Sequence, residues 1–302
     1  MQHSDSLNRS VSCITGAMKI PKRLQPLIRD GLIDEVLRQL MSGKEATVYI
    51  VRCNQEIRCA KVYKEVAKRS FKQAVTYQEG RKVKNSRRAR AMEKGSRFGR
   101  QQQEESWHNA EIDALRRVAA ADVRVPKVYG CVDGVLIMEL ITDKDGDVAP
   151  RLSEVSMTAD EALRDHSTLM GYVVQMLCSG LVHGDLSEFN ILVDEAGPVI
   201  IDMPQAVDAA ANNHAETMLQ RDVDNVTQFY GQFAPELIGR DYAGEIWQLY
   251  EDGQLSPETK LTGLYEKPLE EADVDGVLVE IQAAQDEEEE RLERIRNAEE
   301  DS

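Results

Sequence analysis

The chain has no long hydrophobic run. None of its 302 residues lies in an apolar, uncharged stretch of 18 residues, which excludes a membrane-spanning helix of ordinary length. The first 20 residues are polar, show no periodicity and lack the apolar core of a secretory signal. We therefore expect a soluble, cytoplasmic protein in which residues 1–20 form a flexible leader.

Cysteine is also scarce, and its placement excludes two kinds of structural cross-link. The five cysteines are an odd number and no two of them form a CxxC pair, so neither a disulfide framework nor a zinc cage is predicted. This pattern is typical of a protein in a reducing compartment. The cysteines are Cys13, Cys53, Cys59, Cys131 and Cys178.

Basic residues are outnumbered, but many of them are concentrated in one place. The net charge is −16, and residues 270–302 contribute −11 of it with 14 acidic residues and 3 arginines, which leaves −5 for residues 1–269. Residues 81–100 instead hold nine Lys and Arg against one acidic residue. A strongly negative chain is not a general nucleic-acid binder. The charges therefore predict an acidic tail and a basic flexible loop, and that loop is the part best suited to contact RNA or a ribosome.

Strand patterns dominate the first half of the chain. Apolar residues at helical spacing over 21–40 predict two short helices separated by Gly31, and 101–120 predicts one long helix. Tight turns are predicted at residues 53–56 and 133–134. The β-rich runs that these turns join are 46–52, 57–63, 128–132 and 135–140.

The second half of the chain has mainly helical patterning. A helix is predicted over 160–178, two short strands over 191–193 and 199–201, and mostly helix from there to about residue 269. This order predicts an α+β protein with a cleft between two lobes. The predicted divisions are an N-lobe at 21–141, a C-lobe at 142–269 and the acidic tail at 270–302.

One lysine lies inside a β-rich run. Lys61 is flanked by Ala60 and Val62. A lysine stem packed among apolar strand residues directs its ammonium to one place, and in a nucleotide site such a lysine holds the α and β phosphates. Taken alone, the same pattern also fits the exposed face of an ordinary strand.

A second candidate motif is the run HGDLSEFN at 183–190. It follows a predicted buried helix and precedes a strand, and it has the spacing of a kinase catalytic loop, H-x-D-x-x-x-x-N, with Gly184 where most protein kinases have Arg. In such a loop Asp185 takes the proton of the attacking hydroxyl. The amide oxygen of Asn190 is suited to bind Mg²⁺. The structural alternative is a polar turn capped by Asp and Asn.

A third carboxylate follows twelve residues later. Asp202 ends the apolar run at 199–201, in the place where kinases carry their main Mg²⁺-binding aspartate. Glu111, on the predicted helix 101–120, is a candidate partner for Lys61, although Glu104, Glu105 and Asp113 compete for this role.

A short loop precedes the first predicted strand. It has the sequence Ser42-Gly43-Lys44, and its single glycine excludes both the G-x-G-x-x-G loop and the Walker A motif. Backbone amides near Gly43, together with Ser42 and Lys44, are nevertheless candidates for phosphate contacts.

Together these motifs resemble the RIO family of atypical serine/threonine protein kinases, and in particular its first subfamily. The resemblance covers about residues 42–205, and family-like sequence continues to about residue 235. Met41 and Thr47 depart from it, because the family often has Thr and Asn at these positions. The matching runs are SGKEATVY at 42–49, AKVY at 60–63, Trp107 with Glu111, HGDLSEFN at 183–190 and IDMPQ at 201–205.

The resemblance implies a bilobed protein-kinase-like α+β fold that binds ATP and Mg²⁺ between a strand-rich N-lobe and a helical C-lobe. It implies that Lys61 contacts phosphates, that Glu111 pairs with Lys61, and that Asp185 is the catalytic base. By the same resemblance Asn190 and Asp202 ligate metal, and Asp202 can also accept the phosphoryl group. This last property implies a possible switch-ATPase cycle through an aspartyl-phosphate.

The resemblance also places two further features. The run MELI at 138–141 matches the family hinge, which implies that the backbone groups of Glu139 and Ile141 read adenine. The basic loop at 81–100 aligns with a flexible loop of the family near the ATP entrance. Family members act in the maturation of the small ribosomal subunit in eukaryotes and archaea, a task that a bacterial-type member, which this chain resembles, need not share. Ribosome or RNA association is expected from the basic charge of residues 81–100.

Two other functions remain open at this stage. Small-molecule phosphotransferases of the aminoglycoside or choline kinase type share the H-G-D-x-x-x-x-N loop and a later aspartate. The runs at 43–46 and 203–205 favour the RIO alternative over these enzymes. The third hypothesis is an RNA- or ribosome-associated binding module with vestigial nucleotide binding, supported by residues 81–100, in which Phe98 is the one aromatic residue.

Overall fold

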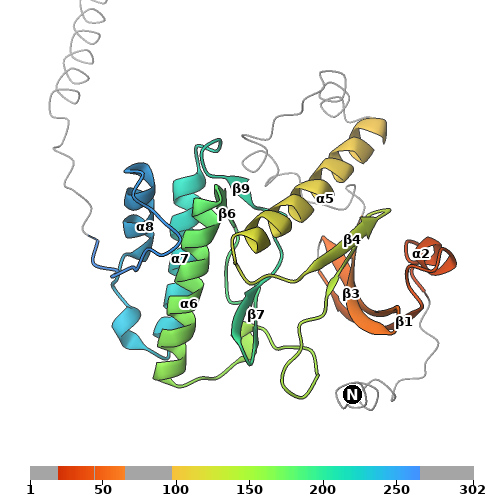
Figure 1. The fold of residues 1–302 in the computed structure, drawn as a ribbon, viewed down its shortest axis with the longest axis horizontal. Coiled ribbons are helices and arrows are strands. Elements are labelled where there is room, and N and C mark those ends of the chain that lie inside the picture. The colour runs from red at the N-terminus through yellow and green to blue at the C-terminus, as the bar shows by residue number, and fades with distance from the viewer. Residues whose placement is uncertain (1–19, 44, 65–96, 266–302) are drawn as a thin grey trace, which may run out of the picture. The chain divides into compact units, whose positions relative to one another are not determined.

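The computed structural model describes residues 20–43, 45–64 and 97–265 (Figure 1). Nearly all of the predicted leader, most of the basic loop and the whole acidic tail lie outside the described residues. Residues 97–100, at the end of the predicted basic loop, belong to a helix. No helix among the described residues is both long enough and apolar enough to span a bilayer.

The N-terminal part is built on one antiparallel sheet of five strands. Its strands lie in the order β1-β2-β3-β5-β4, so the chain forms a β1–β2–β3 meander and then adds β5 beside β3. The four strands predicted for this part of the chain are confirmed, and each of their ends agrees with the prediction to within one residue. The strands are β1 Glu35–Ser42, β2 Ala46–Cys53, β3 Glu56–Tyr63, β4 Val128–Val132 and β5 Val135–Glu139.

Both predicted hairpin turns are present. Asn54 and Gln55 join β2 to β3 with φ of 50° and 70°, and Asp133 and Gly134 join β4 to β5 with φ of 50° and 72°. Two consecutive residues with positive φ produce the turn whose twist matches that of the flanking strands. These turns fix the register in which Lys61 lies opposite Val48.

The prediction of a second helix within 21–40 is wrong. The first helix exists as α2 (Gln25–Arg29), but residues 35–42 form the edge strand β1. The pairing of β1 with β2 is irregular between Val36 and Arg38 and again between Gln39 and Met41. A bulge inserts an extra residue and breaks the alternation of a strand, so the apolar spacing in this segment imitates a helix.

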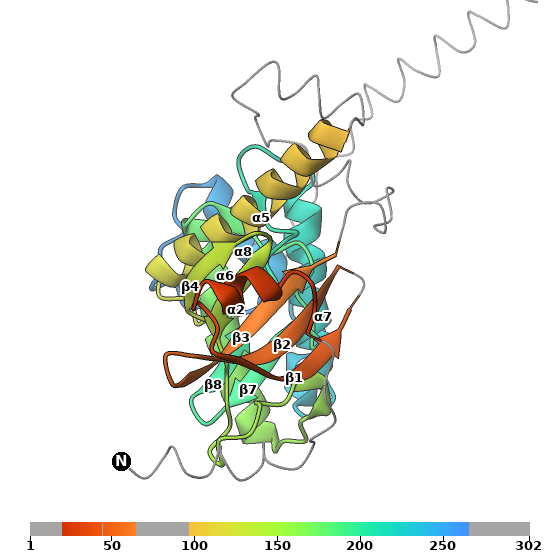
Figure 2. The same ribbon diagram turned by 90° about the vertical axis from the view of Figure 1, so that its right-hand side faces the viewer.

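The two faces of the sheet pack against different helices. Successive strand residues point to opposite faces, and Ala60 and Val62 of β3 belong to one buried cluster with Leu24 and Leu27 around α2. The opposite face of β3 carries Lys61 and Tyr63 and is directed toward α5 (Arg97–Ala120). Figure 2 views the sheet with α2 in front of it.

The C-terminal part is mainly helical, as predicted. The helix α6 (Ala159–Cys178), the hairpin of β7 (Ile191–Asp194) and β8 (Gly197–Ile200), and the helices α7 (Ala215–Gly231) and α8 (Tyr242–Glu251) follow in order. The short 3₁₀ helices are η3 (Leu152–Glu154) and η4 (Pro235–Leu237). A further pair of strands, β6 (Leu181–Val182) and β9 (Val207–Asp208), was not predicted, because two residues are too few to show an alternation.

The helices α6 and α7 form a rigid support for the loop between β6 and β7. Leu169 and Val173 of α6 and Val223 and Val226 of α7 belong to one buried cluster. His166 is also buried there and shares a 3.0 Å hydrogen bond with Thr227 of α7. Burial lowers the pKa of His166 to about 4, so this histidine is neutral at physiological pH and serves packing.

Candidate active site

The predicted lysine lies at the centre of a buried polar cluster. Lys61 Nζ donates to Glu111 Oε1 at 2.6 Å, and the side chains of Lys61 and Glu111 are 9% and 1% exposed. Glu111 belongs to the buried stripe of α5 together with Leu115 and Val118, whereas the competing Asp113 is exposed. The helical period thus selects Glu111 as the partner of Lys61.

Tyr63 supports the same glutamate from the sheet. It lies two residues after Lys61 and therefore on the same face of β3. Its hydroxyl donates to Glu111 Oε2 at 2.5 Å, so both oxygens of the buried carboxylate have partners. Sequence analysis did not identify Tyr63 as a site residue.

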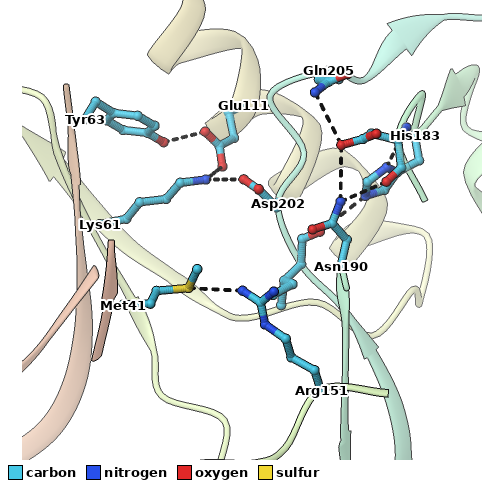
Figure 3. A network of polar contacts seen from close by, with 11 residues as sticks. Met41, Lys61, Tyr63, Glu111, Arg151, His183, Asn190, Asp202 and Gln205 are labelled. Carbon is cyan, nitrogen blue, oxygen red and sulfur yellow. Dashed lines mark hydrogen bonds and ion pairs between the residues drawn. The ribbon is translucent and has the colours of Figure 1, made fainter. Parts of the chain in front are cut away.

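The third member of the cluster comes from the C-terminal part. Lys61 Nζ also donates to Asp202 Oδ1 at 2.5 Å, and Asp202 follows β8 (Figure 3). The backbone of Asp202 has a φ of 68°, a conformation that non-glycine residues rarely adopt and that recurs at functional sites. The structure thus brings together three of the predicted site residues, Lys61, Glu111 and Asp202.

The ionisation of this cluster is strongly coupled. Burial disfavours the charged form of Lys61, but the negative charges of Glu111 and Asp202 outweigh it and raise the pKa of the lysine. Burial likewise opposes ionisation of Asp202, yet the attraction and hydrogen bond of Lys61 hold the pKa of that carboxyl below its usual value. At neutral pH the ammonium of Lys61 is therefore charged and faces an ionised Asp202.

The predicted catalytic loop lies between β6 and β7. Gly184 has a φ of 80°, which favours glycine over other residues at the position where most kinases have Arg. The side-chain amide of Asn190 donates to the backbone carbonyl of Asp185 at 2.8 Å and to Asp185 Oδ2 at 3.4 Å. Gln205 Nε2 donates to the same carboxylate oxygen at 3.3 Å. The side chain of Asp185 is exposed at the surface. Partial removal of its carboxyl from water nevertheless raises the pKa of that group.

Asn190 and Asp202 lie at adjacent strand ends. Ile191 pairs with Ile200 in the β7–β8 hairpin, and the N–H of Ile201 donates to the carbonyl of Asn190 at 2.9 Å. Because the amide nitrogen of Asn190 is bonded to Asp185, its oxygen is left as the acceptor. An amide oxygen beside a carboxylate is the donor set that Mg²⁺ prefers, so these residues fit that ion. No group of three or more His, Cys, Asp or Glu in the described part of the chain offers another metal site.

His183 of the motif has a structural position. Its side chain is buried, its Nε2 lies 3.3 Å from the carbonyl of Ile201, and its Nδ1 accepts the backbone N–H of Asp185 at 3.3 Å. Burial lowers the pKa of His183 to about 4, which keeps the ring neutral and able to accept that hydrogen bond. The histidine therefore links the catalytic loop to the segment that carries Asp202.

Three side chains of α7 hold the backbone of the catalytic loop. The buried carboxylate of Asp222 accepts the N–H groups of Gly184 at 2.7 Å and Leu186 at 2.9 Å. Arg221 donates to the carbonyl of Gly184, and Asn225 donates to the carbonyl of Leu186 at 3.2 Å. Sequence analysis did not identify these residues.

A signal for Asp222 was present in the sequence. It lies four residues after Met218 and four before Val226, on the buried stripe of the helix, where a carboxylate needs a partner. Burial raises the pKa of Asp222 to about 7, although both backbone hydrogen bonds work in the opposite direction.

The loop between β1 and β2 is tied back to β2 and β3. Ser42 Oγ lies 3.2 Å from Thr47 Oγ1 and accepts from Lys64 Nζ at 3.2 Å. The N–H of Gly43 donates to the carbonyl of Ala46 at 2.9 Å, so this particular amide, which we predicted could approach phosphates, is already engaged. The predicted phosphate contact Lys44 lies outside the described residues.

Of the predicted hinge residues, Glu139 is the last residue of β5 and Ile141 follows that strand. The N–H of Glu139 donates to the carbonyl of Lys127 at 2.9 Å, and the carbonyl of Ile141 accepts from Ala149 at 3.0 Å. The backbone groups of these two residues that take no part in those two bonds are the carbonyl of Glu139 and the N–H of Ile141. Among the described residues, no hydrogen bond links Ser42, Glu139 or Ile141 directly to the Lys61 cluster.

Comparisons with known proteins identify the family. The RIO domain family matches residues 47–242, which is more than half of the chain. The chain belongs to the RIO family. It is 36% identical over 210 residues to the RIO-type serine/threonine-protein kinase Rio1 of Haloferax volcanii, which covers 68% of this chain and 66% of that protein. It is 31% identical over 206 residues to the serine/threonine-protein kinase RIO1 of Homo sapiens, covering 68% of this chain and 34% of the human protein.

A solved structure supports the RIO-type fold. The Rio2 kinase of Chaetomium thermophilum, in an ADP/Mg²⁺-phosphoaspartate complex, is similar with a TM-score of 0.50 and 20% identity over 70% of this chain and 59% of that one. The predicted bilobed, kinase-like α+β fold is thereby confirmed. The chain spans about a third to two thirds of the length of the curated relatives named above.

Proposed function

We propose that this RIO-family chain is an ATP- and Mg²⁺-dependent serine/threonine protein kinase. The observation that carries the proposal is the convergence of Glu111 and Asp202 on the ammonium of Lys61, with Asp185 and Asn190 at the neighbouring strand end. This set supplies a base, Asp185. It also supplies a cation for phosphates, Lys61, and two oxygen ligands for a metal, Asn190 and Asp202. The curated relatives are named as serine/threonine-protein kinases.

In this proposal the nucleotide is held by three parts of the chain. The carbonyl of Glu139 and the N–H of Ile141 are an acceptor and a donor, which match the amino group and a ring nitrogen of adenine. Lys61 contacts the α and β phosphates, and Glu111 keeps its ammonium in place. Ser42, at the end of β1, is the third proposed phosphate contact, and Lys44, which was predicted for the same role, lies outside the described residues.

Asn190 and Asp202 are the residues that would hold Mg²⁺. When bound, the ion neutralises charge on the phosphate oxygens. The chain itself orients both ligands: Asp185 fixes the amide of Asn190, and Lys61 fixes the carboxylate of Asp202. The two ligands are thus positioned by the groups that also act in transfer.

The transfer step follows from the position of Asp185. The oxygen of an acceptor Ser or Thr forms a bond to the γ-phosphorus while the bond from that phosphorus to the β–γ bridging oxygen breaks, and ADP leaves with the electron pair. Asp185 accepts the hydroxyl proton. Gln205 and Asn190 hold the carboxylate from two sides and so direct its oxygens.

A second cycle, a switch ATPase, is supported by the exposure of Asp202. Its side chain is 45% exposed and its lowered pKa keeps it ionised, which are the properties of a nucleophile. In this cycle an oxygen of Asp202 attacks the γ-phosphorus, ADP leaves, and water then releases phosphate and restores the carboxylate. The similar Rio2 structure is named as a phosphoaspartate complex.

One labelling experiment tests both cycles. Incubation with γ-labelled ATP and Mg²⁺ gives an acid-stable label if Ser or Thr is the acceptor, and a hydroxylamine-labile label if Asp202 is. We expect Asp185→Ala to lower the formation of acid-stable label by about 10²-fold or more while it leaves ATP binding largely intact. Asp202→Ala weakens Mg²⁺-dependent ATP binding and abolishes the labile label. Normal turnover by Asp185→Ala contradicts the assignment of the base.

We further propose a cytoplasmic location, a division into lobes at 21–141 and 142–269, and ribosome or RNA association through the basic residues 81–100. The family match and the kinase relatives do not favour the small-molecule phosphotransferase or the vestigial RNA-binding module.

A further inference from the structure

Arg151 is a charged residue beside the site that no part of the proposed mechanism uses. It immediately precedes the short helix η3, and its side chain is partly buried. Figure 3 shows this side chain extending toward the group formed by Lys61, Asp202 and Asn190. Its guanidinium contacts the N-terminal part, where Nη2 lies 3.2 Å from the thioether sulfur of Met41.

The backbone of Arg151 is fixed to the elements that carry the metal ligands. Arg151 forms an isolated bridge with Leu192 of β7, and the neighbouring Pro150 accepts the N–H of Val193 at 2.9 Å. The N–H of Arg151 donates to Glu154 at 3.0 Å. Ser153 donates to the carbonyl of Glu188 in the catalytic loop at 3.1 Å. The guanidinium therefore starts from a rigid position next to Asn190.

The contact partner of this guanidinium, the sulfur of Met41, is a weak hydrogen-bond acceptor. Within the described residues no carboxylate lies at ion-pair distance from Arg151, whereas Arg124 pairs with Asp194 and Arg58 pairs with Glu56. A thioether is a poor hydrogen-bond acceptor, and a guanidinium has five N–H donors. Arg151 is thus left with most of its N–H donors unused by side-chain acceptors in the part of the chain that the structure describes.

The charge of Arg151 acts on Asp202. Burial raises the pKa of Asp202, and the positive charge of Arg151 is a smaller one of the causes, led by Lys61, that together lower it. Met41, its contact, directly precedes the Ser42-Gly43 loop that the proposed function places over the phosphates. A second fixed cation between that loop and the metal ligands has the chemistry of a phosphate-binding residue, since guanidinium forks match phosphate oxygens.

We propose that Arg151 binds the phosphate groups of the nucleotide, as a second cation opposite Lys61. This inference rests on the proposed function, because it requires that the site takes a nucleoside polyphosphate. Arg151 contributes charge-assisted hydrogen bonds to phosphate oxygens from the C-terminal part, and Lys61 contributes them from the sheet. The weak contact with Met41 positions the guanidinium without competing for its donors.

The test measures the binding of Mg²⁺–ATP and of adenosine by calorimetry in the full chain. We expect Arg151→Met to weaken ATP binding by about tenfold or more, because at least one charge-assisted hydrogen bond is lost. The binding of adenosine, which has no phosphate, stays unchanged. Arg151→Lys, which keeps the charge but not the fork, recovers part of the loss. The matched control is Arg164→Met, which removes an exposed arginine of α6 and leaves ATP binding as in the wild type.

Several results would overturn the inference. Wild-type affinity of Arg151→Met for ATP shows that the guanidinium does not touch the phosphates. An equal loss for ATP and adenosine shows that Arg151 acts by positioning the two parts of the chain. An equal loss in Arg164→Met shows a general effect of charge. Failure of the wild-type chain to bind ATP contradicts the proposed function. ATP binding by the wild type together with undiminished binding by Arg151→Met contradicts only the inference about Arg151.

Discussion

At the scale of single residues, the most informative feature is the pair of bonds that Glu111 accepts. A buried carboxylate is costly unless its oxygens are satisfied, and here Lys61 and Tyr63 each satisfy one oxygen. Both donors come from one face of β3 because they are two residues apart. The strand spacing that directs Lys61 toward Glu111 thus also brings the hydroxyl of Tyr63 to the second oxygen of that glutamate.

Removal of the hydroxyl of Tyr63 isolates this second bond. We expect Tyr63→Phe to lower the free energy of unfolding by about 2 kcal/mol, because a buried charged acceptor loses one donor. Urea denaturation measures this change. The matched control is Tyr129→Phe, since Tyr129 is 40% exposed, and we expect a change within about 0.5 kcal/mol. Equal effects of the two variants would show that the bond to Glu111 contributes nothing.

The sequence predicted some site residues better than others, and the reason is physical. Lys61 and Asp202 stand out because each charged residue adjoins an apolar strand. Glu111 was one of four candidate acids, and only its position on the buried stripe of α5 distinguishes it from the exposed Asp113. Arg151 carries no such local signal, because its importance depends on contacts with Met41 and β7 that tertiary structure creates.

At the scale of elements, α7 determines the shape of the catalytic loop. Asp222 accepts two loop amides, while Arg221 and Asn225 donate to two loop carbonyls. The loop backbone is therefore paired as fully as a strand would be, without belonging to a sheet. The motif could be recognised from sequence, but this support could not, since it comes from a helix more than thirty residues away.

The ionisation of Asp222 gives this support a pH dependence. Burial raises its pKa to about 7 in the folded state, well above the value near 3.9 of an unfolded Asp. Between these values the folded state holds a proton that the unfolded state has lost. The free energy of unfolding therefore falls as pH rises through this window, by at most about 1.4 kcal/mol per pH unit from this group.

Asp222→Asn removes this titration. We expect the dependence of unfolding free energy on pH to become flatter between pH 4.5 and about pH 7 in the variant, as measured by urea denaturation at several pH values. The variant also loses one backbone acceptor, which lowers stability at every pH without changing the slope. An unchanged slope would contradict the raised pKa of Asp222.

The segment at 33–42 shows why one element was predicted wrongly. Its apolar residues Ile33, Val36, Leu37 and Leu40 have helical spacing, but two irregularities in the β1–β2 pairing shift the strand alternation. Hairpins with clear turn residues, such as Asp133-Gly134, were predicted correctly because a turn with positive φ depends on local chemistry. Edge strands with bulges depend on the partner strand, which a single sequence window does not show.

At the scale of the whole molecule, Lys61 joins the sheet to the helical part. It is the residue through which β3, α5 and the segment after β8 are held at one point. A buried cation that satisfies two carboxylates is strongly linked to stability, because removing it leaves uncompensated charge. The centre that we propose for catalysis is consequently also a structural joint.

The variant Lys61→Met tests this joint. We expect it to lower the free energy of unfolding by about 3 kcal/mol or more, because Glu111 and Asp202 lose the cation that pairs with both of them. The double variant Lys61→Met with Glu111→Gln recovers part of this loss. Arg52→Met, which breaks an ion pair of 3.6 Å with the exposed Glu35, serves as the control and costs at most about 1 kcal/mol. An equal loss of unfolding free energy in Lys61→Met and Arg52→Met would show that Lys61 does not join the sheet to the helical part.

The hold of α7 on the catalytic loop has a consequence for how this chain can change over evolutionary time. Asp222 and Asn225 form hydrogen bonds with backbone N–H and carbonyl groups of the loop, and these bonds do not depend on the loop's own side chains. Replacement of an outward-facing loop residue such as Phe189, which is 53% exposed, leaves these bonds untouched. Preference for new acceptors can therefore be acquired one substitution at a time, with little risk to the architecture beneath.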